Sequence, residues 1–321
     1  METLQADLFY EHDCNSETDR SQIQARENFA RAAKTMIVKT QRAKLNLQGE
    51  KAYQKLDHDS SMPNLVRMGG EDPFSSSLNI ICRHLTQLQL TAIIDKSFFW
   101  PNEDESIVWP NMESLQVKFS PVTPSGSWYF VGPRGEGKNV QGYPVNGVEY
   151  SGGSPNTENN TVIAHTPCQP SAWRIKPNPD TLYPLLTGFA KAAAQMPRLR
   201  EAMIWAPIWW SPDGNDSSKF AYHKAYNMMN RGRPLGWGIG YTAPGPGQED
   251  GVPESEDSDD EEVRLFEWRT GDWEPDETIR SLFHDIGREQ HGEEFDDNWD
   301  PDANQEDLFF EGFCFGDQLE G

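Results

Sequence analysis

The chain has 321 residues, of which only 36% are hydrophobic, and its formal net charge is −23. The excess negative charge lies in the last quarter, where 27 acidic and 4 basic residues fall between Glu249 and Gly321, and an acidic chain repels the phosphate backbones of nucleic acids. Widely spaced cysteines, no signal peptide and no long apolar run predict an intracellular protein of the cytoplasm or nucleus without a membrane partner.

The N-terminal part is expected to contain little beyond one helix. Residues 1–20 are polar and expected to be disordered, and residues 21–56 predict a basic amphipathic helix. Its apolar stripe consists of Phe29, Ala33, Met36, Ala43 and Leu47. Basic residues, Arg26 among them, cover the remaining faces. We expect the helix to pack on the core with these faces in solvent, although an anionic surface would also suit them.

A central domain is predicted over residues 60–247. The segment Trp109–Phe119 has the spacing L-x-x-L-x-V-x-F, which predicts a short strand with one buried face. Similar apolar frames occur at Leu85–Leu90 and Leu199–Trp205, and Asn178–Met196 has the periodicity of a helix. We expect three equivalent positions to be neighbours in one sheet: Leu88, Leu115 and Ala202. The predicted fold is α/β, an irregular leucine-rich-repeat-like layer of short, mainly parallel strands backed by helices, with long Gly/Pro-rich insertions.

The remaining segments complete this domain and extend it. Gly236–Tyr241 alternates glycine with large residues and predicts a strand that packs closely on its neighbour. Residues 248–262 predict a disordered acidic linker. Residues 263–292 predict a strand, able to pair with Gly236–Tyr241, followed by a helix. Residues 293–321 predict an acidic tail.

Two motifs resemble ligand sites without meeting their requirements. Gly132–Lys138 matches the G-x-x-x-x-G-K pattern of a phosphate loop, but Asn139 replaces the Ser or Thr, and the following residues cannot form the helix that would hold the phosphates. Acidic residues from Asp300 onward have the spacing of a calcium loop, but Gln305 stands where that loop needs glycine. We therefore predict no cofactor and no metal.

Candidate functional residues lie mostly in the loops. His165 and Cys168 are three positions apart in a Gly/Pro-rich region, which leaves a hydrolase or transferase as the alternative function. Aromatic side chains are the more favoured candidates, because they contribute large contact areas to protein interfaces. The predicted partner-binding residues are Trp128, Tyr129, Trp209, Trp210, Phe309 and Phe310.

Several phrases resemble the C-terminal, leucine-rich-like region of filamentous-fungal F-box proteins. The phrases are Trp109–Phe119, Gly126–Gly132, Leu185–Trp205, Leu235–Pro244 and Asp272–Gly292. In that family an N-terminal F-box recruits a ubiquitin-ligase core and the region behind it presents a substrate. Residues 1–60 contain no counterpart of the L-P-x-E-[IL] opening of an F-box. The resemblance therefore implies a non-enzymatic, substrate-recognition-like module with a protein partner.

Overall fold

The computed structural model describes residues 3–7, 16–35, 40–47, 62, 64–67, 72–101, 109–132, 174–209, 234–245, 263–271 and 273–299. Within these residues one large sheet has eight strands, and their order in the sheet is the order along the chain. The strands are β1 (Thr3–Asp7), β2 (Arg42–Asn46), β3 (Gln87–Ala92), β4 (Ser114–Phe119), β7 (Glu201–Trp209), β8 (Pro234–Thr242), β9 (Arg264–Arg269) and β10 (Phe295–Asn298). Strands β5 (Phe130–Val131) and β6 (Lys176–Pro177) form a separate antiparallel pair.

The large sheet is mostly parallel. Strands β1, β2, β3, β4 and β7 run in one direction, β8 is antiparallel to both of its neighbours, and β9 and β10 return to the first direction. Leu88 is the register partner of Leu115, which in turn is the partner of Ala202. These three positions therefore lie side by side, and the prediction of an α/β fold with one mainly parallel sheet is confirmed.

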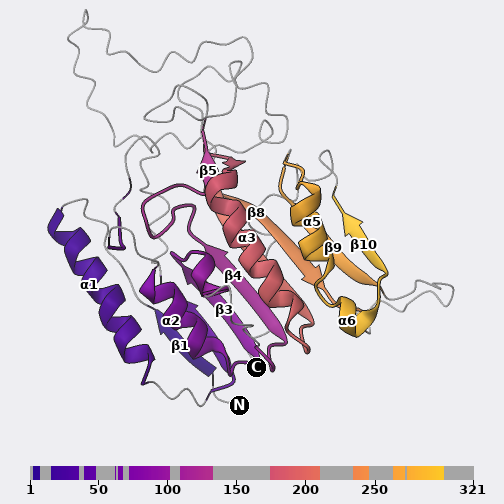
Figure 1. Cartoon of the computed structure of the whole chain (residues 1–321), viewed down its shortest axis with the longest axis horizontal. Helices are drawn as coiled ribbons and strands as arrows, with labels where there is room; N and C mark the ends of the chain where they lie inside the picture. Colours follow the sequence, from indigo (N-terminus) through magenta and orange to yellow (C-terminus); the bar gives the residue numbers. More distant parts are fainter. Residues whose placement is uncertain are drawn as a thin grey trace, which may run out of the picture.

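The helices form a layer on one side of this sheet, in front of it in Figure 1. They are α1 (Ser16–Ala33), α2 (Pro73–Cys82), the short 3-10 helix η2 (Lys96–Phe98), α3 (Pro179–Ala194), α5 (Glu277–His284) and α6 (Arg288–His291). Contacts link neighbours across the layer, from α1 to α2, from α2 to η2, from η2 to α3 and from α3 to α5. A chain that repeatedly leaves the sheet and returns to its next position produces such a one-sided layer.

Helix α3 shows how the sequence sets the limits of an element. Asn178 accepts a hydrogen bond from the backbone N–H of Asp180, and Pro179 occupies the first turn, where its missing N–H costs nothing. The helix ends at Ala194, before Pro197. Its buried side chains include Leu182, Leu185, Leu186, Phe189 and Ala193. The helix predicted over Asn178–Met196 is thus confirmed within two residues at each end.

The core lies between the helices and the facing side of the sheet. In β3 and β4 every second side chain is buried, which is the period of two that one covered face requires. Large aromatic side chains fill much of this space, and pairs such as Phe99 with Phe189 and Trp268 with Phe283 join different elements. The aromatic residues offset the low hydrophobic fraction of the chain.

The structure corrects the prediction for the N-terminal part. Helix α1 begins at Ser16, inside the stretch expected to be disordered, and it ends at Ala33. Arg42–Asn46 is strand β2, not a continuation of the helix. Ala43, Leu45 and Leu47 are all buried, an alternation of period two that fits a strand. Thr3–Asp7 pairs with this strand as β1.

The prediction for the C-terminal part agrees with the structure in the pairing of its strands and differs from it in the limits of its elements. Strand β8 pairs with β9 across the acidic linker, as predicted. The single helix predicted within residues 263–292 is two helices, because Gly287 adopts a φ of +71° between α5 and α6. Phe295–Asn298, assigned to the acidic tail, forms the edge strand β10. The linker itself lies outside the described residues.

Candidate functional site

The side of the sheet opposite the helices is the main candidate surface, and we call it the open face. No helix of the described part of the chain covers it, as Figure 1 shows. Its side chains alternate with core residues, and on β2, β3 and β4 they are at least partly exposed. On β2, β3, β4 and β7 the open face carries Arg42, Lys44, Asn46, Gln87, Gln89, Thr91, Ser114, Gln116, Lys118, Glu201, Met203 and Trp205.

The half of the open face formed by β2, β3 and β4 is basic. Arg42, Lys44 and Lys118 lie here, and the sequences of these three strands contain no Asp or Glu. The Gln89 amide nitrogen donates a hydrogen bond to the Gln116 side-chain oxygen across 3.2 Å. We call these five residues the basic half. Cationic and amide side chains on a flat, partly exposed surface can bind carboxylates and peptide groups.

The centre of the open face is apolar and closely packed. Met203 and Trp205 of β7 form a small buried cluster separate from the main core. The Lys118 ammonium lies 5.0 Å from the centre of the Trp205 ring, which is within the range of a cation–π contact. Gly238 of β8 is the register partner of Trp205, and a Cβ atom at that glycine would lie 2.5 Å from the Trp205 Cβ. Glycine is thus required there by the close approach of the two strands.

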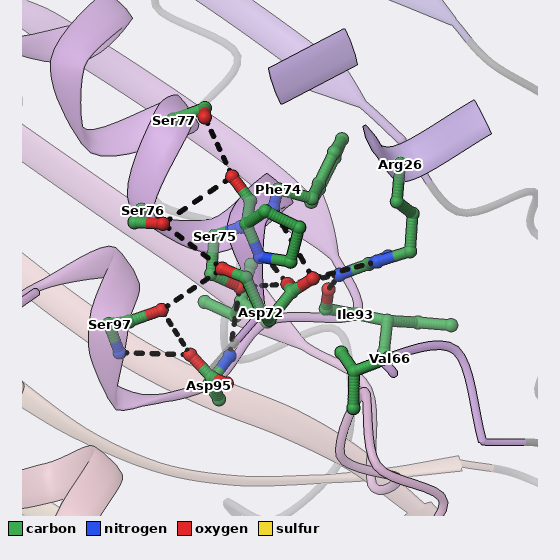
Figure 2. A network of polar contacts seen from close by, with 12 residues as sticks. Arg26, Val66, Asp72, Phe74, Ser75, Ser76, Ser77, Ile93, Asp95 and Ser97 are labelled. Carbon is green, nitrogen blue, oxygen red and sulfur yellow. Dashed lines mark hydrogen bonds and ion pairs between the residues drawn. The ribbon is translucent and has the colours of Figure 1, made fainter. Parts of the chain in front are cut away.

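A buried polar network lies at the carboxyl ends of β3 and β4, where α/β proteins often bind ligands. Asp72 caps helix α2, and its carboxylate accepts hydrogen bonds from the Ser75 N–H at 3.0 Å and the Ser75 hydroxyl at 2.6 Å. Arg26 of α1 donates to both carboxylate oxygens of Asp72 and, across 2.9 Å, to the Ile93 carbonyl. Figure 2 shows these contacts converging on Asp72.

The network continues to Asp95 and Tyr129. Burial raises the pKa of Asp95, hydrogen bonds from Ser97 oppose the rise, and the negative charge of Asp72 adds to it. The Tyr129 hydroxyl donates to the Ile94 carbonyl at 2.7 Å, and burial together with the charges of Asp95 and Asp72 raises its pKa well above the usual value. These groups are buried and bonded to one another. The network therefore joins α1, α2 and η2 and does not present a reactive group to a substrate.

A second polar cluster lies between α5 and β10. Trp268 and His284 both contact the Asp297 carboxylate, and the His284 Nε2 atom is 3.1 Å from Asp297 Oδ2. Burial alone would raise the pKa of Asp297, but the hydrogen bonds from His284 and Trp268 and the positive charge of Arg280 outweigh it, so the pKa is lowered. This cluster fastens the edge strand β10 to the rest of the sheet.

Two of the predicted partner-binding residues are buried in the structure. Tyr129 is 1% exposed and belongs to the main core. Trp128 is 8% exposed, packs on Val122, and has the Arg174 guanidinium 4.5 Å from its ring centre. Both were selected as aromatic residues beside a Gly-rich loop, but each ring is enclosed by neighbouring side chains, so neither offers an exposed contact.

The other candidates lie outside the described residues. This applies to Trp210, Phe309, Phe310, His165 and Cys168. The backbone of Trp209 ends strand β7, but its side chain is not among those described. The enzymatic alternative around His165 and Cys168 accordingly stays a prediction.

Sequence reasoning missed the two polar clusters for different reasons. Arg26 was assigned to an exposed helix face, yet it is 4% exposed. Its burial was not predictable from the local sequence, because its partner Asp72 lies 46 residues away. His284 was not among the predicted functional residues, and its partner Asp297 is on a strand that was not predicted. The one signal present was Asp72-Pro73, an acidic cap followed by proline at a helix start.

Two kinds of feature were sought in the part of the chain that the structure describes: clusters of metal-ligating side chains and helices able to span a membrane. The described residues contain no cluster of three or more His, Cys, Asp or Glu that could hold a metal ion. None of the helices described there has both the length and the hydropathy that crossing a bilayer requires.

The fold and the open face define an α/β protein with a mostly parallel sheet that the described helices cover on one side only. Comparisons with protein-family models, curated proteins and solved structures gave no match.

Proposed function

We propose that this chain is a non-enzymatic protein-interaction module that binds a partner through the open face of its sheet. The observation that carries the proposal is the one-sided helix layer, which leaves a broad, partly exposed sheet surface with polar and basic side chains. Side chains on a rigid sheet are held in fixed positions relative to one another, which reduces the entropy lost when a partner binds.

The finer architectural proposal is a degenerate leucine-rich-repeat-like scaffold. In its support, the strands follow one another in chain order, and Leu88, Leu115 and Ala202 occupy equivalent positions on adjacent strands. The antiparallel β8 and the uneven lengths of chain between strands depart from a regular repeat. Repeat proteins of this type present an extended surface on which a partner lies across several strands.

The relation to fungal F-box proteins supplies the biological role in this proposal. It rests on the phrases quoted above, and the residues between Trp109 and Phe119 form β4 and the turn before it. Under this proposal the module recognises a protein destined for ubiquitination, as the leucine-rich-like region does in that family. Residues 1–60 offer no F-box sequence, so the proposal is restricted to recognition and does not extend to recruitment of the ligase.

A pair of charge-reversal variants of the full chain tests the proposed surface. The open-face variant is Lys44→Glu with Lys118→Glu. The matched control is Lys34→Glu with Lys191→Glu, which makes the same charge change in the turn after α1 and on helix α3. Each tagged chain is used for quantitative affinity purification from a filamentous-fungal lysate with the proteasome inhibited. A partner retained by the wild-type and control chains but lost from the open-face variant supports the proposal. Capture of nothing, or equal capture by all three chains, contradicts it.

A further inference from the structure

The basic half of the open face has a complement in the same chain. Residues 301–321 contain six acidic residues and no Lys or Arg. Of the acidic residues described on the open face, Glu201 accepts a hydrogen bond from Ser114 and Glu267 lies 3.5 Å from the Arg269 guanidinium, whereas the exposed Asp296 lies on β10, at the edge of the sheet away from the basic half. The positive charges of Arg42, Lys44 and Lys118 attract a negatively charged segment to this half of the surface.

Residues 301–321 follow shortly after β10, the strand at one edge of the sheet. One row of register partners crosses the open face from Asn298 of β10 through Glu267, Gly240, Met203, Gln116 and Gln89 to Lys44. The six intervals between strands in this row span about 29 Å. A segment of 21 residues reaches up to about 70 Å when extended, so residues 301–321 can cross the sheet from β10 to β2.

We propose that residues 301–321 bind across the basic half of the open face in the same molecule and compete there with protein partners. The proposal rests on the proposed function, because it takes the open face as a contact surface. Covalent attachment gives the segment an effective concentration in the millimolar range, so weak charge-assisted contacts suffice to hold it. The Gln89 and Gln116 amides add hydrogen-bonding groups for its backbone.

Zero-length crosslinking of the full wild-type chain with a carbodiimide tests the inference, because this reagent joins an amine to a carboxylate only where the two are in contact. Four lysines serve as reporters: Lys44 and Lys118 on the open face, Lys34 in the turn after α1, and Lys191 on α3. Peptide mass spectrometry is expected to find crosslinks from Lys44 and Lys118 to residues 301–321. Their yield should not change on dilution, and a mixture of isotope-labelled and unlabelled chains should give crosslinks within single copies.

A variant and a control test whether the crosslinks depend on the positive charge of the open face. Arg42→Glu leaves the reporter Lys44 in place but reverses a neighbouring charge on the open face, and it should reduce the Lys44 crosslinks several-fold. Arg31→Glu on α1 makes the same change away from the sheet and should leave them unaltered. Crosslinks only at Lys34 or Lys191, crosslinks only between copies, or none to residues 301–321 would overturn the inference.

The two proposals fail in different ways. If no crosslink joins the open face to residues 301–321 but the open-face variant loses its partner, the inference about these residues is wrong and the proposed function stands. If the crosslinks form as expected but no chain captures a partner, the contact of residues 301–321 with the open face stands, and the proposed function fails together with the competition.

Discussion

Arg26 and Asp72 form a buried ion pair in which the guanidinium donates to both carboxylate oxygens, and the side chains are 4% and 0% exposed. Removing one member leaves the other charged, buried and unpaired. We expect Arg26→Ala to lower the free energy of unfolding by about 3–5 kcal/mol. Urea denaturation followed by circular dichroism measures this change. The pair of Arg67 with Glu27 provides the control, since the Arg67 side chain is 74% exposed, and Arg67→Ala should cost less than about 1 kcal/mol. Similar losses for the two variants would contradict the structural role of the buried pair.

Two glycines of β8 should respond differently to the addition of a methyl group. At Gly238 a Cβ atom would lie 2.5 Å from the Trp205 Cβ and 2.8 Å from the Ile204 carbonyl oxygen, whereas at Gly240 the nearest atom is 3.7 Å away. We expect Gly238→Ala to destabilise the protein by about 1–3 kcal/mol, because the strands must move apart. Gly240→Ala should have no cost or stabilise slightly. Urea midpoints of both variants check this, and a tolerated Gly238→Ala would show that β7 and β8 are not so closely packed.

The Asp297 carboxylate should make stability depend on acidity. Its pKa is lower in the folded protein than in the unfolded chain, so the unfolded state takes up a proton first as the pH falls. The stabilisation is fully present above the unfolded pKa of about 3.9 and is lost as the pH falls through the lower, folded value. Unfolding free energies measured between pH 7 and pH 2 should therefore decrease less steeply in acid for Asp297→Asn than for the wild type.

The neighbouring Asp296 is the control for that measurement. It lies on the opposite side of the same strand and is exposed. Asp296→Asn should leave the acid dependence of the wild-type chain unchanged. If both variants follow the wild-type curve, the contacts of Asp297 with Trp268 and His284 do not stabilise the folded state.

The thiol of Cys82 should be inert in the folded protein. The residue is 0% exposed at the end of helix α2, and burial raises its pKa to about 12. Since only the thiolate reacts, iodoacetamide at pH 8 should leave Cys82 unmodified in native conditions and alkylate it after denaturation in urea. Peptide mass spectrometry distinguishes the two states. Rapid modification of the native protein would indicate that α2 opens readily away from the sheet.

The sequence predicted those parts of the fold in which the apolar pattern is local and regular. Helix α3 and strands β4, β7 and β9 each have a clear period and recognisable end signals, and Leu88, Leu115 and Ala202 are neighbours as expected. Pairing of β8 with β9 was also predictable, since both are short apolar runs joined by a polar linker. These elements depend mainly on interactions encoded within a few residues.

The missed elements are those whose stability comes from distant partners. Strand β2 has only five residues, and the spacing from Phe29 to Leu47 matches a helix as well as a strand. Strands β1 and β10 are short, polar edges that become recognisable only through the strand beside them. Arg26 has the local pattern of a solvated residue, and only the folded chain brings Asp72 to it. Of the candidate site, the burial of Trp128 and Tyr129 was not predicted, because it depends on side chains distant in the sequence.

The agreement between strand order and chain order bears on how the protein forms during synthesis. Each strand of the large sheet joins the free edge of those that precede it in the chain, and none has to insert between two earlier ones. The sheet can therefore grow from β1 toward β10 as the polypeptide leaves the ribosome, and each new helix can cover the strand that was just added. Until the next strand is synthesised, the newest edge carries unpaired backbone groups, and within the described residues β10 is the last strand to join.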